Sequence, residues 1–138
     1  MKKFINKTKT AQMEALIINT IFGHVLGDFF FQSRPMSENK YKPGRIGIIW
    51  CTVHVLIYTF FVAAASVNFS PIFLVGVLVP HWIIDRWSLA YKWMTIIGRG
   101  NLLASTDYKE VSFGTIIYVT LDQTLHLGCL YILIKLKK

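Results

Sequence analysis

The sequence predicts an all-α integral membrane protein, a four-helix bundle formed by a single membrane domain over residues 1–138. Apolar residues make up 54% of the chain and charged residues only 16%. The charged residues lie mostly at the two ends and in two connecting segments, which leaves four long apolar runs. Each run is close to the roughly 20 apolar residues that a helix needs to cross a hydrocarbon core.

Each expected span is bounded by polar residues. The first follows a basic N-terminal segment, and the polar loop SRPMSENKYKPGR separates it from the second. The break NFSP precedes the third span, and a mixed, glycine-containing segment precedes the fourth, which ends at the basic tail KLKK. We expect the spans at about 11–32, 46–67, 71–90 and 111–134.

Two other classes of chain fit less well. A cleaved signal peptide would be followed by a small-residue cleavage site, and its core would not carry His24 and Asp28. A soluble helical bundle would show a polar face at helical spacing, whereas these runs are apolar almost all round.

Aromatic residues mark the end of the third span. Trp87, Tyr91 and Trp93 cluster there, and amphipathic rings favour the headgroup level of a bilayer. The segment 93–104 that follows is either a short interfacial helix between the third and fourth spans or a plain loop.

The net charge of +8 indicates membrane lipids as partners and no nucleic acid. The basic residues flank apolar segments instead of forming a stripe on one helix, as headgroup-binding residues do. The lysines and arginines are almost equally divided between the two sides of the membrane. Because the first helix often decides orientation, we expect both termini in the cytoplasm.

All four histidines lie in apolar runs, and three of them have an aspartate four residues away. The pairs are His24 with Asp28, His81 with Asp85, and Asp122 with His126, while His54 stands alone. Residues four apart share one face of a helix, so both groups of a pair can reach a common point. A charge at mid-membrane costs at least about 2.5 kcal/mol, so such groups usually face the bundle interior.

Imidazole and carboxylate together suit a divalent metal ion, with zinc expected first and manganese or iron as alternatives. The predicted helix ends place these groups in one half of the membrane, facing the longer loops, with His126 the deepest. Gln32 and Gln123 are expected to hydrogen-bond to the ligands. Interhelical hydrogen bonds that only hold the bundle together, worth about 1 kcal/mol each, are the alternative. The expected metal ligands are His24, Asp28, His54, His81, Asp85, Asp122 and His126.

The segments HVLGDFFFQS, PHWIIDRW and LDQTLHL, together with His54, resemble a family of small bacterial and phage membrane proteins known as domain of unknown function 3307. The resemblance covers nearly the whole chain and implies a bacterial inner membrane protein. The chain is also similar, more distantly, to inner-membrane proteins described as metal-dependent hydrolases. Only this second likeness implies hydrolysis. The family motif carries over to His24, Asp28, Gln32, His54, His81, Asp85, Asp122, Gln123 and His126.

A metal-dependent hydrolase acting on a lipid-like or phosphate-containing substrate is the function we expect. Asp28 or Asp85 would act as general base, and Arg86 at the mouth of the site would bind an anionic substrate. Two other classes remain open: a transporter or ion relay that uses the same groups, and a non-enzymatic phage or bacterial envelope protein. Four helices are few for a monomeric carrier, so a relay would require a homo-oligomer.

Overall fold

The computed structural model describes the backbone of residues 2–136 and the side chains of residues 9–136. No strand occurs in the described residues, which confirms the all-helical prediction. The elements, in order, are α1 (Lys2–Val25), a π-helix (Leu26–Phe30), α2 (Arg34–Asn39), α3 (Gly44–Ala65), α4 (Pro71–Arg86), α5 (Leu89–Ile96), a 3₁₀ helix (Gly100–Ala104) and α6 (Tyr108–Leu136).

Among the described residues, three helices are long and apolar enough to cross a membrane: Lys9–Phe30, α3 and α6. The third expected span is instead a bent pair, because α4 and α5 meet the same criterion only together and are bent by 53°. The bend lies at Ser88, whose φ of 47° is left-handed and cannot continue a helix. The 3₁₀ helix follows α5 within the segment 93–104, and its place at a membrane surface stays a prediction.

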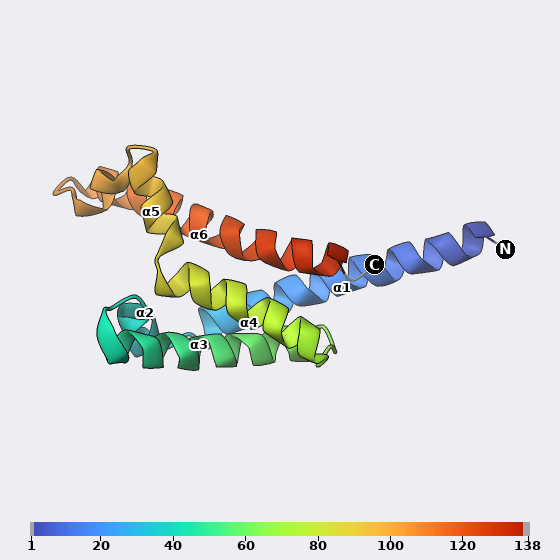
Figure 1. Ribbon diagram of the computed structural model, residues 1–138. Coiled ribbons are helices and arrows are strands. Elements are labelled where there is room, and N and C mark those ends of the chain that lie inside the picture. The colour runs from blue at the N-terminus through green and yellow to red at the C-terminus, as the bar shows by residue number, and fades with distance from the viewer. Residues whose placement is uncertain (1, 137–138) are drawn as a thin grey trace.

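The long helices contact one another in a closed ring. In this ring α1 packs on α3, α3 on α4, α4 on α6, and α6 returns to α1. Figure 1 shows α2 and α5 at one end of this arrangement, while the N-terminal part of α1 extends beyond the other helices at the opposite end. The interior of the ring is where the polar residues of the apolar runs meet.

Two glycines allow the backbones of the first helix and α3 to approach closely. A Cβ atom at Gly23 would lie 2.7 Å from Val62 Cα, and one at Gly27 would lie 2.8 Å from Tyr58 Cα. Small residues spaced four apart permit such close packing of membrane helices. The residues that follow these glycines, His24 and Asp28, are thereby brought beside α3.

Apolar side chains cover the outside of the helices, whereas the histidines lie together inside. Ile18, Phe60, Ile72 and Ile116, from four different helices, are each more than half exposed. All four histidines, in contrast, are at most 2% exposed. Ionisable residues of membrane helices usually face the protein interior in this way.

Candidate metal centre

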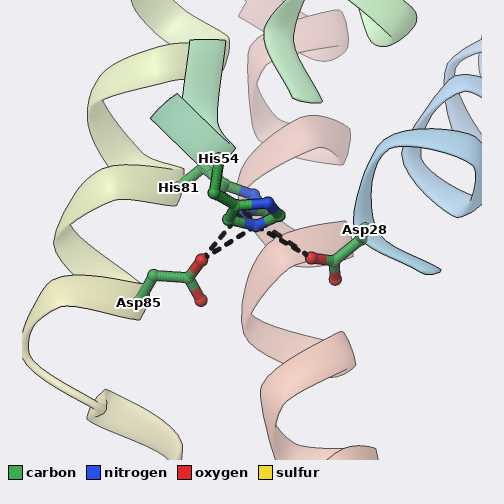
Figure 2. A group of neighbouring side chains, drawn as sticks. All are labelled: Asp28, His54, His81 and Asp85. Carbon is green, nitrogen blue, oxygen red and sulfur yellow. Dashed lines mark hydrogen bonds and ion pairs between the residues drawn. The ribbon is translucent and has the colours of Figure 1, made fainter. Parts of the chain in front are cut away.

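Three elements supply the side chains at the centre of the ring. Asp28 lies in the π-helix, His54 in the middle of α3, and His81 and Asp85 one turn apart near the end of α4. A short π-helix changes the direction in which its side chains point and is frequent at functional sites. Figure 2 shows the two carboxylates approaching the paired imidazole rings from opposite sides.

Two imidazole nitrogens and two carboxylate oxygens converge there. His54 Nε2 lies 3.1 Å from His81 Nε2, 3.3 Å from Asp28 Oδ1 and 3.1 Å from Asp85 Oδ2. His81 Nε2 lies 3.2 Å from Asp85 Oδ2 and 3.8 Å from Asp28 Oδ1. One potential ligand atom from each residue lies within 4.8 Å of all the others. We call these four residues the first ligand group.

This arrangement has the geometry to hold a cation. Both ring nitrogens face each other, so two N–H groups would point at one another if each ring carried its proton there. A divalent ion placed among the four atoms would accept both nitrogen lone pairs and offset both carboxylates. The ring of Tyr58 stacks on the ring of His81, with the ring centroids 3.7 Å apart. The buried Asp/His cluster therefore has the composition and spacing to hold a metal ion.

A second ligand group shares Asp28 and adds Asp122 and His126 from α6. His126 Nδ1–H donates to the carbonyl oxygen of Asp122 at 2.9 Å, which leaves the lone pair of the ring on Nε2. His126 Nε2 is buried, makes no hydrogen bond to the described residues, and lies 3.7 Å from Asp85 Oδ1. His126, expected to be the deepest of the set, thus faces the cluster.

His24 belongs to neither ligand group, and both of its ring nitrogens have other hydrogen-bond partners. Gln123 Nε2 donates to Asp28 Oδ2 at 2.9 Å, so Gln123 Oε1 must accept from His24 Nε2–H at 2.7 Å. The other nitrogen, Nδ1, then accepts from the Tyr58 hydroxyl at 3.0 Å. This chain of hydrogen bonds ends on Asp28 and orients its carboxylate.

Both glutamines contact residues of the first ligand group. Gln123 Nε2 donates to Asp28 Oδ2, and hydrogen-bond partners of this kind orient metal ligands. Gln32 Nε2 lies 3.1 Å from His54 Nε2, the nitrogen that faces the other ligand atoms, so Gln32 would have to release this nitrogen when an ion binds there. Arg86, expected at the mouth of the site, donates through Nη1 to the carbonyl oxygen of Tyr41 at 3.3 Å.

Sequence reasoning missed Lys40, as it missed Tyr58, which contacts His24 and His81. Lys40 Nζ lies 2.8 Å from Asp85 Oδ2, and the side chain of Lys40 is only 13% exposed. Burial alone would lower the pKa of Lys40, but the carboxylates of Asp85 and Asp28 outweigh this effect. The pKa therefore lies above its ordinary value, and the ammonium group stays charged.

Residues 16–138 match a protein family described as "Protein of unknown function (DUF3307)". The chain belongs to this family. The match includes every residue of both ligand groups, and it confirms the resemblance seen in the sequence motifs. No curated protein and no solved structure matches the chain. Membership of DUF3307 supplies no reaction, and the comparisons do not support the more distant likeness to hydrolases.

Replacing Gln123 with methionine is expected to weaken metal binding by about 10–100-fold, because Asp28 loses the donor that orients it. Methionine has a similar length but cannot bridge His24 and Asp28. Metal affinity of the purified variant, measured by competition with a chelator of known affinity, checks this result. Thr124→Val is the matched control, since Thr124 is exposed on the same helix and its hydroxyl donates to the carbonyl oxygen of Thr120, away from the ligand groups. Unchanged affinity in Gln123→Met would show that the hydrogen-bond chain does not position a ligand.

Proposed function

We propose that this protein is a membrane-embedded, metal-dependent hydrolase with a divalent ion bound by the first ligand group. The observation that carries the proposal is the convergence of two imidazole nitrogens and two carboxylate oxygens, all from buried side chains on three helical segments. A mixed nitrogen and oxygen set suits zinc first, and manganese or iron as alternatives. Three helices with the length and composition of spans, and a fourth as a bent pair, support a location in a membrane, and we propose the bacterial inner membrane.

Hydrolysis is the reaction that these groups support best. The bound ion would lower the pKa of a water ligand and polarise a phosphoryl or acyl oxygen. The carboxylates Asp28 and Asp85 are the candidate general bases. Asp28 Oδ2 already accepts a hydrogen bond from Gln123, whereas Asp85 Oδ1 has no hydrogen bond within the described residues. Asp85 is therefore the better placed of the two to accept a proton from the attacking water.

An anionic, lipid-like substrate fits the surroundings of the site. Lys40 places a positive charge against the first ligand group, and Arg86 lies at the same end of α4. Cationic groups beside a bound metal ion attract phosphate oxygens. The outward faces of the surrounding helices are apolar, so a substrate with acyl chains could reach the site from the bilayer. A phosphate ester of a lipid combines both properties.

Metal analysis and a hydrolysis assay on the wild-type protein test the proposal together. Protein purified in detergent is expected to retain about one divalent ion per chain through gel filtration. It should release phosphate from phosphatidic acid in mixed micelles, lose this activity on treatment with a chelator, and regain it with zinc. Protein that holds no stoichiometric metal contradicts the proposal. Bound metal without hydrolysis, but with proton or metal flux in liposomes, would instead assign the site to an ion relay.

A further inference from the structure

The two ligand groups share Asp28 in a way that separates its two oxygens. Asp28 Oδ1 faces the first ligand group, 3.3 Å from His54 Nε2. The other oxygen, Oδ2, faces α6, where Gln123 Nε2 lies 2.9 Å from Asp28 Oδ2 and 3.3 Å from Asp122 Oδ2. A carboxylate in this position can bind one ion with each oxygen, as bridging carboxylates do in helical-bundle metal proteins.

His126 supplies an independent indication of a second ion. Its ring is 1% exposed, and the nitrogen that carries the lone pair, Nε2, makes no hydrogen bond to the described residues. A buried polar atom left without a partner costs free energy, so a native structure usually provides one. Zinc, manganese and iron all accept an imidazole nitrogen, and one potential ligand atom each from Asp28, Asp122 and His126 lies within 4.8 Å of the other two.

The charge of the cluster determines when a second ion can bind. Asp28, Asp85 and Asp122 carry three negative charges and Lys40 one positive charge, which leaves two negative charges when the histidines are neutral. One divalent ion neutralises the cluster. A second would leave two uncompensated positive charges in a buried site, which is unfavourable unless an anion enters with it.

We infer that Asp28, Asp122 and His126 form a second metal site, bridged to the first by Asp28 and filled together with a phosphate group of the substrate. This inference rests on the proposed function and specifies its substrate class as a phosphate ester. Metal ions about 3.5–4 Å apart bind the attacking and leaving oxygens of a phosphoryl transfer between them. Asp122 and His126 then contribute to catalysis only when substrate is bound.

Manganese titration with and without inorganic phosphate tests the second site without any assay of activity. Metal-free protein in detergent is expected to bind about one Mn²⁺ per chain alone and about two with phosphate, and the pair should give an exchange-coupled electron paramagnetic resonance spectrum. Asp122→Asn should keep the first ion and lose the second. Asp107→Asn is the matched control, because Asp107 is exposed outside the site and asparagine caps a helix equally well.

The possible results separate this inference from the proposed function. One ion per chain in both conditions overturns the second site and leaves a one-metal hydrolase intact. Two ions regardless of phosphate overturn the coupling to an anion. No bound ion in either condition contradicts the first ligand group, and the proposed function fails with it. The wild-type titration is decisive even if Asp122→Asn does not fold.

Discussion

Asp85→Asn is expected to weaken zinc binding by more than about 100-fold. Loss of a hydrogen-bond partner outside the coordination shell already lowers metal affinity by about 10–100-fold, and loss of a direct ligand should lower it further. Asp85 lies 3.1 Å from His54 Nε2 and 3.2 Å from His81 Nε2, so its loss removes one oxygen from the first ligand group. Hydrolysis of phosphatidic acid should disappear along with the metal. Equilibrium dialysis against zinc buffered by a chelator measures the change in affinity.

The stability of this variant needs a separate control, because Asp85 is also the partner of Lys40. Removing one member of a buried ion pair typically costs about 3–5 kcal/mol. The double variant Asp85→Asn, Lys40→Met removes both charges and should recover much of the lost stability without recovering metal binding. Asp107→Asn should resemble the wild type in both measurements. Wild-type zinc affinity in Asp85→Asn would contradict the first ligand group.

Lys40→Met is expected to lower the melting temperature of the metal-free protein and to bind zinc at least about tenfold more tightly. Without the ammonium group, the cluster carries one more uncompensated negative charge. The interaction of two unit charges about 4 Å apart amounts to several kcal/mol at a protein-like dielectric constant, so the ion should be attracted more strongly. Metal should therefore raise the melting temperature of this variant more than that of the wild type. Thermal unfolding in detergent, with zinc or with chelator, measures the difference.

Lys42→Met controls for the loss of a lysine from the same loop. Lys42 is exposed and donates a hydrogen bond to Asn39, away from the carboxylates. Its replacement should leave both the melting temperature and the zinc-induced increase unchanged. An equal zinc-induced increase in Lys40→Met and the wild type would show that the Lys40 charge and the ion do not interact.

Helical periodicity predicted much of the site, because the relevant geometry is local. The pairs His81 with Asp85 and Asp122 with His126 remain close within regular helix, with nitrogen to oxygen distances of 3.2 and 3.5 Å. Isolated charges in an apolar run are costly, so we expected these groups to be buried together. All three paired histidines are buried. Burial of His54 followed from the same reasoning.

The remaining features depend on backbone and tertiary contacts that no spacing rule contains. The π-helix that holds Asp28 departs from the α-helical repeat, and Gln123 bridges His24 to Asp28 by hydrogen bonds. Lys40 lies in a polar loop, where nothing in the pattern distinguishes it from its neighbour Lys42. The bend between α4 and α5 arises at Ser88, a residue type with no strong preference for left-handed backbone.

The contact of Gly23 and Gly27 with α3 has a consequence for the geometry of the proposed metal site. A helix advances about 1.5 Å per residue, whereas metal–ligand distances tolerate deviations of only about 0.2 Å. A slip of one residue along α3 would therefore take Asp28 out of coordination range of any ion held by His54. At both glycines the two backbones are in direct contact, because an added Cβ would lie only 2.7 or 2.8 Å from a main-chain atom of α3. Rigid main-chain atoms therefore set the distance between Asp28 and His54. In the proposed metal site, the fixed register of these two helices would keep Asp28 and His54 within coordination range of one ion.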